Sequence, residues 1–237
     1  MLSSCDNPLE YRGSDAPDKL VVNSLMSVQD TLHFVQLAVS TVRNVKSVDN
    51  AALKCFVNGV LASETQELKE GRLYFPADLS AGDKVRLEVE ADSRFSASAE
   101  VTVPRQTVIE SISTETIKQR TFLEDSVTTY IRYNIRLQNP TREDAYYSVK
   151  IAQEYIPCIG RELLQPEVRE DLVEGQSDGS IAVSNISMQH YYYLKALNHI
   201  ASGSDDLALE DISIPDNVNG GIGFVGVSNI TVTDVTP

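Results

Sequence analysis

Strict alternation of apolar and charged side chains is the feature that most constrains how this chain can fold. In Val85-Arg86-Leu87-Glu88-Val89-Glu90 every second residue is apolar, which predicts a β-strand with one face in a core and the other in water. Asn58-Gly59 lies between two apolar runs. Because both central positions of a type I′ turn need positive φ, this dipeptide predicts a β-hairpin. Six or seven predicted strands precede Pro104, at the turn spacing typical of an immunoglobulin-like β-sandwich.

A proline marks the boundary between two predicted domains. Pro104 ends strand pairing because proline lacks an N–H group, and a new β-rich run starts at Thr107. Residues 127–139 and 145–155 both alternate, and turn-forming residues lie between them. We therefore predict that these two runs pair as one long hairpin with one face exposed to solvent. Residues 157–179 show no period, which predicts a loop with a short helical turn.

A single helix is predicted, over about residues 187–202. Its apolar side chains recur at spacings of three and four residues, as on one helix face: Tyr193, Leu194, Leu197, Ile200 and Ala201. Ser187 is the predicted N-cap and Gly203 the predicted stop. Of the three consecutive tyrosines at 191–193, we expect two to pack and one to lie near the surface.

These patterns together predict an all-β fold of two β-sandwich domains. We expect a tether over residues 1–18, an immunoglobulin-like β-sandwich over residues 19–105, and a second β-sandwich with one packed α-helix over residues 106–237. A length of 237 residues is comfortable for two domains of roughly 100–120 residues each.

The N-terminal segment carries a lipidation pattern. Leu2-Ser3-Ser4-Cys5 fits the small-residue motif at which bacterial lipoprotein signal peptides are cut before an acylated cysteine. We interpret the chain as starting just inside the end of a removed signal, with Met1 added, so that Cys5 bears the lipid. The alternative is a cytosolic protein with a cysteine there by chance. No apolar run approaches the roughly 20 residues that cross a bilayer, so we expect membrane attachment through Cys5.

The charge balance excludes some partners. The chain has 20 Lys and Arg against 34 Asp and Glu, a net charge of −14. Nucleic-acid binding draws most of its affinity from cations that neutralise phosphates, and docking on an anionic leaflet needs a polybasic patch. We therefore expect no nucleic-acid partner.

The two remaining cysteines are predicted to be free. Cys55 lies inside a predicted strand and Cys158 lies far along the chain, in the other predicted domain. We expect a buried free thiol at each position, with a Cys55–Cys158 disulfide in an oxidising compartment as the alternative.

A glycine motif near the C-terminus does not predict a dinucleotide site. Gly221, Gly223 and Gly226 have the GxGxxG spacing, but that turn must follow a strand and open a helix. A β-type run follows instead, and too little chain remains for a βαβ unit. We expect these glycines to allow bulges or close backbone approach in an edge strand.

No metal or cofactor site is predicted. His33 lies in a predicted strand, while His190 and His199 lie nine residues apart on the helix and point in opposite directions, so they cannot form an i, i+4 zinc pair. Acidic residues cluster near the C-terminus: Asp205, Asp206, Glu210, Asp211 and Asp216. They lack the regular calcium-loop spacing. We expect a solvated acidic loop there, with calcium binding as the alternative.

Several stretches together resemble one family of lipoproteins: Cys5-Asp6 with its short tether, KLVVNSL at 19–25, DNAAL at 49–53, YYYLK at 191–195 and NVNGGIGFVG at 217–226. The chain resembles Bacteroidota outer-membrane lipoproteins that carry a domain of unknown function and are often encoded beside SusC-like, TonB-dependent transporters. The resemblance spans nearly the full length and is most specific at 217–226. The chain is shorter than is usual for the family, which we attribute to a reduced loop at 157–179.

The resemblance implies a location and a role but no catalytic residues. We expect a lipid-anchored protein of the outer membrane, on its periplasmic face or at the cell surface. The leading hypothesis is a non-enzymatic accessory or binding component of nutrient uptake beside a TonB-dependent β-barrel transporter. The alternatives are a structural lipoprotein of the adhesin or fimbrial kind that assembles by strand donation, and a hydrolase of extracellular glycans, whose paired carboxylates are set by space and not by sequence.

Overall fold

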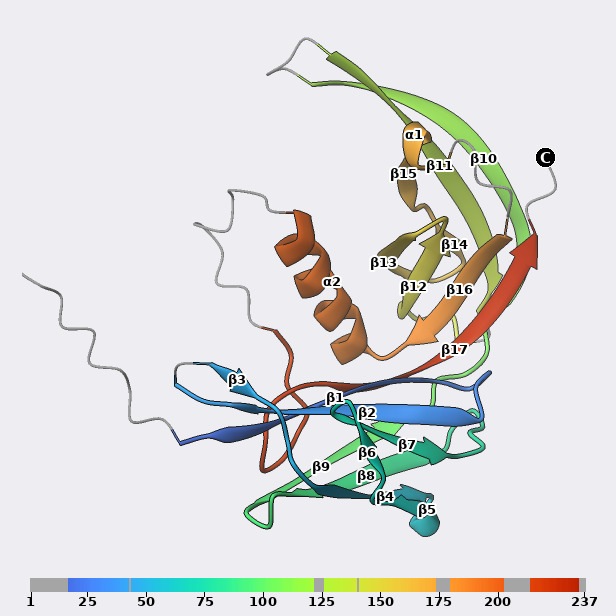
Figure 1. The fold of residues 1–237 in the computed structure, drawn as a ribbon. Helices are drawn as coiled ribbons and strands as arrows, with labels where there is room; N and C mark the ends of the chain where they lie inside the picture. The colour runs from blue at the N-terminus through green and yellow to red at the C-terminus, as the bar shows by residue number, and fades with distance from the viewer. Residues whose placement is uncertain are drawn as a thin grey trace, which may run out of the picture.

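The described part of the protein consists mostly of β-strands (Figure 1). The computed structural model describes residues 17–42, 44–121, 126–139, 141–173, 180–202 and 214–234. The elements in chain order are β1 Lys19–Ser27, β2 Leu32–Ser40, β3 Val45–Lys46, β4 Ala51–Val57, β5 Val60–Thr65, β6 Leu68–Lys69, β7 Arg72–Pro76, β8 Lys84–Ala91, β9 Phe95–Thr102, β10 Val108–Thr121, β11 Ser126–Gln138, β12 Ala145–Ile151, β13 Glu154–Gly160, β14 Leu163–Leu164, β15 Glu167–Arg169, α1 Glu170–Val173, β16 Ser180–Ile186, α2 Met188–Ser202 and β17 Val225–Asp234.

The described strands form three sheets. A nine-stranded sheet has the order β13-β12-β16-β17-β1-β2-β7-β6, with β3 paired to β2. One four-stranded sheet has the order β5-β4-β8-β9, and the other contains β10, β11, β14 and β15. The two small sheets cover different halves of the large one, so each half forms a two-layer sandwich. The all-β sandwich prediction is therefore confirmed.

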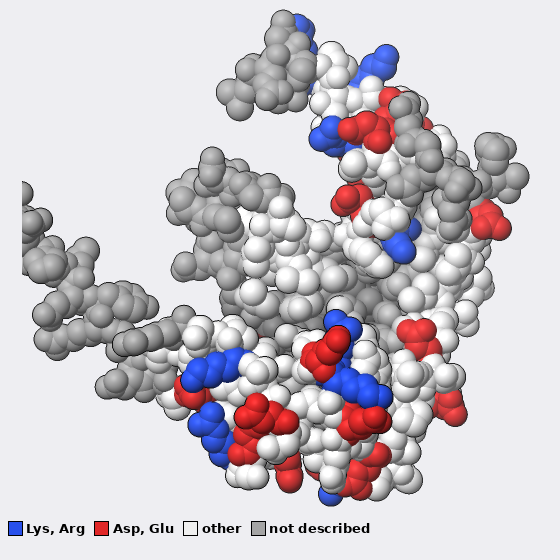
Figure 2. Space-filling view, viewed as in Figure 1, with Lys and Arg blue, Asp and Glu red and all other residues white. Residues whose placement is uncertain are grey.

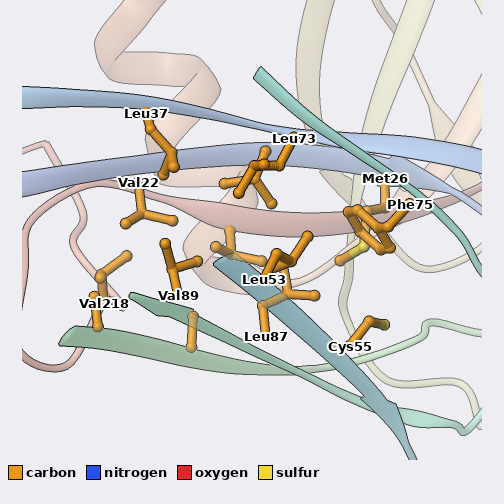
Figure 3. Close-up of a cluster of buried hydrophobic side chains, with 14 of the residues drawn as sticks. Val22, Met26, Leu37, Leu53, Cys55, Leu73, Phe75, Leu87, Val89 and Val218 are labelled. Atoms are coloured by element: carbon orange, nitrogen blue, oxygen red, sulfur yellow. The ribbon is translucent and has the colours of Figure 1, made fainter. Parts of the chain in front are cut away.

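The first sandwich is held together by a large apolar core between β1, β2 and β7 on one side and β4 and β8 on the other. Figure 3 shows the two layers meeting, with Val22, Leu37, Leu73 and Phe75 from the large sheet and Leu53, Leu87 and Val89 from the small one. Val85, Leu87 and Val89 are all buried, as the alternation along β8 predicts. Burying each such side chain stabilises the fold by about 2 kcal/mol, which exceeds what any exposed ion pair contributes.

The second sandwich has its own core, but one strand is shared between the two halves. Side chains of β11, β12, β14, β15 and β16 form the second cluster of buried residues. β17 pairs antiparallel with β16 and parallel with β1. Val218, Val225 and Val227 accordingly belong to the first core, although they lie in the segment that the sequence placed in the second domain. The nine-stranded sheet therefore combines strands from both sides of residue 105, where the sequence predicts the boundary between two domains.

The predicted hairpin around residues 58 and 59 is confirmed. Asn58 and Gly59 have φ values of 51° and 80°, as a type I′ turn requires, and they connect β4 to β5. The Asn58 side chain also donates to the Asp83 carboxylate at 2.7 Å, which ties this turn to the start of β8.

The predicted pairing of residues 127–139 with residues 145–155 is wrong. β11 pairs along its whole length with β10, whereas β12 pairs with β13 and β16. The turn signal between the two runs is real, because the Asn139 side chain accepts from the Thr141 and Arg142 N–H groups. That turn carries the chain from one sheet to the other. Alternation identifies a strand but not its partner.

The loop prediction for residues 157–179 is correct only in part. β13 continues to Gly160, and the short strands β14 and β15 add to the edge of β11. The predicted helical turn is α1. Pro157 lies in β13, which is the edge strand of the large sheet, where a missing N–H group leaves no ladder bond unmade. Residues 174–179 lie outside the described residues.

Candidate docking face

The nine-stranded sheet has one covered face and one largely open face. On β1, Leu20 and Val22 point into the first core, so Val21, Asn23 and Leu25 lie on the opposite face. Along the other strands of this sheet, alternate side chains likewise point to one face or the other. The two small sheets both pack on the covered face. α2 lies on the open side, and β17 bends so that the sheet curves around the helix (Figure 1). We call this open side the α2 face.

α2 is anchored to the α2 face through Phe224. The Tyr193 ring stacks on the Phe224 ring, with centroids 4.4 Å apart, and the His190 ring lies 5.5 Å from it. Phe224 is only 1% exposed. Gly226 makes room for this packing, because a Cβ atom there would lie 2.8 Å from Phe224 and 3.0 Å from His190 Nδ1.

The helix begins where the sequence predicts, but of its predicted apolar face Tyr193 packs on the sheet whereas Leu197 and Ile200 do not. The Ser187 hydroxyl accepts from the His190 N–H at 3.1 Å, which confirms the N-cap. Tyr192 is the exposed member of the three tyrosines, as expected. Leu197 and Ile200 are exposed instead of buried, because α2 contacts the sheet mainly through His190, Tyr191 and Tyr193. Gly203 lies outside the described residues.

His190 is a buried, neutral group in this contact. Burial lowers the pKa of its imidazole from 6.5 to about 4, and a hydrogen bond to the backbone of Val227 offsets part of that effect. Its Nδ1 atom is buried without a hydrogen-bond partner among the described residues. Charging this ring inside the α2 contact would therefore oppose folding.

Acid is expected to weaken the fold through His190. Below about pH 6.5 the unfolded chain binds a proton at this histidine and the folded chain does not, until the pH reaches about 4. The free energy of unfolding is therefore unaffected by this group above about pH 6.5 and falls as the pH decreases from 6.5 to 4, by about 3 kcal/mol at most. Urea unfolding of the wild type and of His190→Gln between pH 7.5 and pH 4 measures the effect. Equal pH slopes for both proteins would contradict the assignment.

An apolar row crosses the α2 face beside the helix. Leu25 on β1 is next to Gly226 on β17, and continuing the Asn23–Gln36 register places Leu25 opposite Phe34 on β2. Phe34 in turn lies opposite Tyr74 on β7, with ring centroids 5.9 Å apart. We call Leu25, Leu32, Phe34 and Tyr74 the Phe34 platform; their side chains are 51%, 61%, 38% and 38% exposed. Isolated apolar side chains on a surface are ordinary, but a contiguous group of this kind marks an interaction site.

The charge on the α2 face is opposite in sign to that of the whole chain. Among the described residues of its strands and of α2, the charged side chains are Lys19, Lys69, Arg72, Lys150, Lys195 and Asp234, which is five cations and one anion. The chain as a whole carries −14. In Figure 2 the surface over α2 is largely uncharged, while acidic and basic side chains are dense over the first sandwich.

Two of these cations are stacked on exposed aromatic rings. The Arg72 guanidinium carbon lies 4.9 Å from the centre of the Phe34 ring, and its Nε donates to the Gln36 side chain at 2.8 Å. The Lys150 Nζ atom lies 5.5 Å from the centre of the Tyr155 ring. Neither cation has a carboxylate partner within the described part of the chain. Both are therefore positioned for a partner that brings its own negative charge.

An open hollow adjoins the Phe34 platform at the β6 end of the sheet. It has a volume of about 650 Å³ and is lined by Leu32, Glu67, Lys69, Glu70 and Tyr74. Glu67 pairs with Lys69 at 2.8 Å. Because this hollow is shallow and continuous with the platform, it suits the edge of a docked surface better than an enclosed substrate.

The residues singled out from the sequence do not form a shared site. Cys5 and four members of the acidic cluster (Asp205, Asp206, Glu210 and Asp211) lie outside the described residues; the carboxylate of the fifth, Asp216, accepts from the Val218 N–H. His33 is buried in β2 with Nε2 3.0 Å from the Ala77 carbonyl. In the described part of the chain no group of three His, Cys, Asp or Glu side chains could hold a metal ion.

Cys55 and Cys158 are both free, as predicted; Cys55 is buried, whereas Cys158 is only partly buried. Burial raises the pKa of the Cys55 thiol to about 11 and that of Cys158 to about 12. A thiolate is the reactive form of cysteine, so both side chains act as small apolar groups in the cores.

The glycine segment shows the predicted close backbone approach but not the predicted edge position. A Cβ atom on Gly221 would lie 2.6 Å from the Leu20 carbonyl oxygen, and one on Gly223 would collide with that of Val22. β17, however, lies between β16 and β1 in the interior of the nine-stranded sheet. The glycines are needed because β1 and this segment run side by side at contact distance.

The Phe34 platform was missed at the sequence level, although a signal for it exists. In Leu32-His33-Phe34-Val35 the side chains on both faces of the strand are apolar or aromatic. His33 and Val35 point into the core, so Leu32 and Phe34 lie on the other face. A strand that is apolar on both faces indicates a second contact surface.

No described helix is long and apolar enough to span a membrane.

Comparison with known proteins gives a family without an assigned role. A family model described as a domain of unknown function, DUF4249, matches residues 6–234. No curated protein matches the sequence. A solved structure concerned with host cell surface retention of a 1.5-MDa bacterial ice-binding adhesin is similar over 93% of this chain and 64% of that chain, at 12% identity and a TM-score of 0.23. A likeness at that TM-score carries no argument about this chain.

Proposed function

The chain belongs to the DUF4249 family, and from this premise we propose that it is a non-catalytic, lipid-anchored protein of the bacterial outer membrane. Its role is that of an accessory or binding component of nutrient uptake beside a TonB-dependent β-barrel transporter, in a member of the Bacteroidota. The Leu2-Ser3-Ser4-Cys5 motif supports the lipid anchor.

The observation that carries the binding role is the Phe34 platform on the α2 face. Its four apolar side chains are exposed side by side on a strongly acidic protein. Aromatic side chains and arginine are the residue types enriched at protein–protein contacts. Phe34, Tyr74 and Arg72 lie together in this row, so the α2 face has the composition of a docking surface.

One observation favours the structural alternative. β10 is 14 residues long and is an edge strand of its sheet. An unpaired edge offers its N–H and C=O groups to another strand. An adhesin or fimbrial subunit that assembles by strand donation would use this edge and not the Phe34 platform.

Purification from native outer membranes tests the proposal. The gene is expressed with its own signal peptide, and mass spectrometry identifies the modification of Cys5 and every protein that co-purifies, with Cys5→Ala as the control. We expect an acylated Cys5 and a stoichiometric β-barrel transporter, both lost in the control. A lipid-free cytosolic product would overturn the proposal, and acylation with self-association alone would favour the adhesin alternative.

A further inference from the structure

We propose that the Phe34 platform, together with Arg72, binds a segment of a partner polypeptide that combines carboxylates with apolar side chains. The inference rests on the proposed function and names the chemistry of the partner that the α2 face takes. Three features of the described residues carry it: the local sign of the charge, the positioning of Arg72, and the shape of the surface.

The first feature is the reversal of charge. The strands and the helix of the α2 face hold five cations and one anion, on a chain with a net charge of −14. Glu67 and Glu70 line the adjoining hollow, where Glu67 pairs with Lys69, so the surplus of positive charge is carried by the other four cations. Five arginines on other surfaces pair with carboxylates: Arg86 with Glu88, Arg94 with Asp18, Arg132 with Glu115 and Glu167, Arg161 with Asp144, and Arg169 with Asp171. Arg105, Arg136 and Arg142 have no carboxylate partner among the described residues. Arg72 has no such partner among the described residues. The missing negative charge is what a docked partner would supply.

The second feature is the way in which Arg72 is held. Stacking on Phe34 and the bond from Nε to Gln36 fix the plane of the guanidinium group. Its terminal nitrogens make no hydrogen bond to a described residue. A guanidinium held in this way can accept a carboxylate in bidentate geometry with little loss of side-chain freedom. Leu25 and Tyr74 lie in the same row on either side of Phe34, so apolar side chains beside that carboxylate would meet apolar surface.

The third feature is the shape of the surface, which favours a polypeptide over a lipid bilayer. The nine-stranded sheet curves around α2, and the helix stands on the same face as the platform (Figure 1). A planar membrane cannot follow a concave surface, whereas a loop or strand of a partner can enter it. Anionic lipid would also need a polybasic cluster, whereas four of the five cations are spread over the sheet from β6 to β12 and the fifth lies on α2.

Selection from a library of short random peptides displayed on phage tests the inference with purified protein. The targets are the wild type, Arg72→Glu and Phe34→Ser, with Arg136→Glu as the matched control. Arg136 is exposed on β11 in a different sheet, so its substitution changes the net charge equally but away from the platform. Urea unfolding checks that each variant keeps its fold.

We expect the wild type to enrich peptides in which Asp or Glu lies beside Leu, Phe or Tyr. Binding of the selected synthetic peptide should weaken by about tenfold or more in Arg72→Glu and Phe34→Ser, and with rising salt, and by less than about twofold in Arg136→Glu. Enrichment of basic peptides, no enrichment over Arg72→Glu, or equal weakening in Arg136→Glu would overturn the inference.

Two further outcomes would replace the proposed occupant. Binding to vesicles of phosphatidylcholine with about one-third phosphatidylglycerol, without peptide selection, would make the face a lipid surface. Platform-dependent dimers in sedimentation experiments would make the occupant a second copy. Neither result bears on Cys5 acylation or on the co-purifying transporter, so failure of this inference is distinguishable from failure of the proposed function.

Discussion

Replacing Gly223 with alanine is expected to lower the free energy of unfolding by about 4 kcal/mol or more. Two costs combine at this position. The φ angle is +127°, which side chains of L-residues rarely adopt, and an added Cβ would collide with the Val22 carbonyl oxygen and lie 2.9 Å from Asn23 Oδ1. Because both contacts come from β1, relief requires β1 and the glycine segment to separate.

Gly59→Ala is the matched control for this substitution. Gly59 also has a positive φ, of +80°, but no atom lies within 4 Å of an added Cβ. Only the backbone cost applies there, about 1 kcal/mol. Urea unfolding of both variants measures the two values. Equal losses would show that the close approach of β1 and residues 217–224 contributes nothing to stability.

Phe224→Ala is expected to cost about 3–5 kcal/mol and to release α2 from the sheet. Phe224 is 1% exposed and forms the surface on which Tyr193 stacks and against which His190 packs. Without this ring, α2 keeps the hydrogen bond between His190 and the backbone of Val227 and its contacts with β12 and β13, among them the bond from Asn198 to the Tyr155 carbonyl.

Hydrogen exchange reports that release directly. Amide protons of α2 should exchange faster in Phe224→Ala than in the wild type, by more than the overall loss of stability accounts for. Tyr192→Ala, which removes an exposed ring from the same helix, should change stability by less than about 0.5 kcal/mol. Unchanged protection of α2 in Phe224→Ala would mean that other contacts anchor the helix.

The features that were predictable from sequence are those set by near neighbours. The turn at Asn58-Gly59, the alternation along β8 and the N-cap at Ser187 each depend on a few consecutive residues, and all three are confirmed. Their physical causes are the φ preference of a turn, the period of a strand and the unsatisfied N–H groups of a helix start. No distant part of the chain is needed to specify them.

The features that could not be predicted are the choices of partner strand. β17 pairs with β1 across about 200 residues, as Leu25–Gly226 shows, and β11 pairs with β10 instead of with the strand that follows it. A periodic pattern fixes which side chains share a face but not which strand lies beside it. The expected edge position of the glycine segment failed for this reason, although its close backbone approach was foreseen.

The Phe34 platform is an intermediate case. The strand period assigns Leu32 and Phe34 to the face opposite His33 and Val35, but only the assembled sheet shows that no small sheet covers that face and that Leu25 and Tyr74 complete the row. The exposure of Leu197 and Ile200 on α2 has the same origin, because the helix period predicts an apolar stripe without saying what covers it.

The central claim, that the α2 face is where this protein holds its partner, is tested most directly by photo-crosslinking in cells. A photoreactive residue replaces Tyr74 on the platform or, as the control, Leu61, which is exposed on β5 in the opposite layer of the first sandwich. The account predicts that position 74 crosslinks to a β-barrel transporter of the outer membrane and that position 61 does not. Crosslinks from position 61 alone, or none from position 74 in a protein that reaches the membrane, would contradict it.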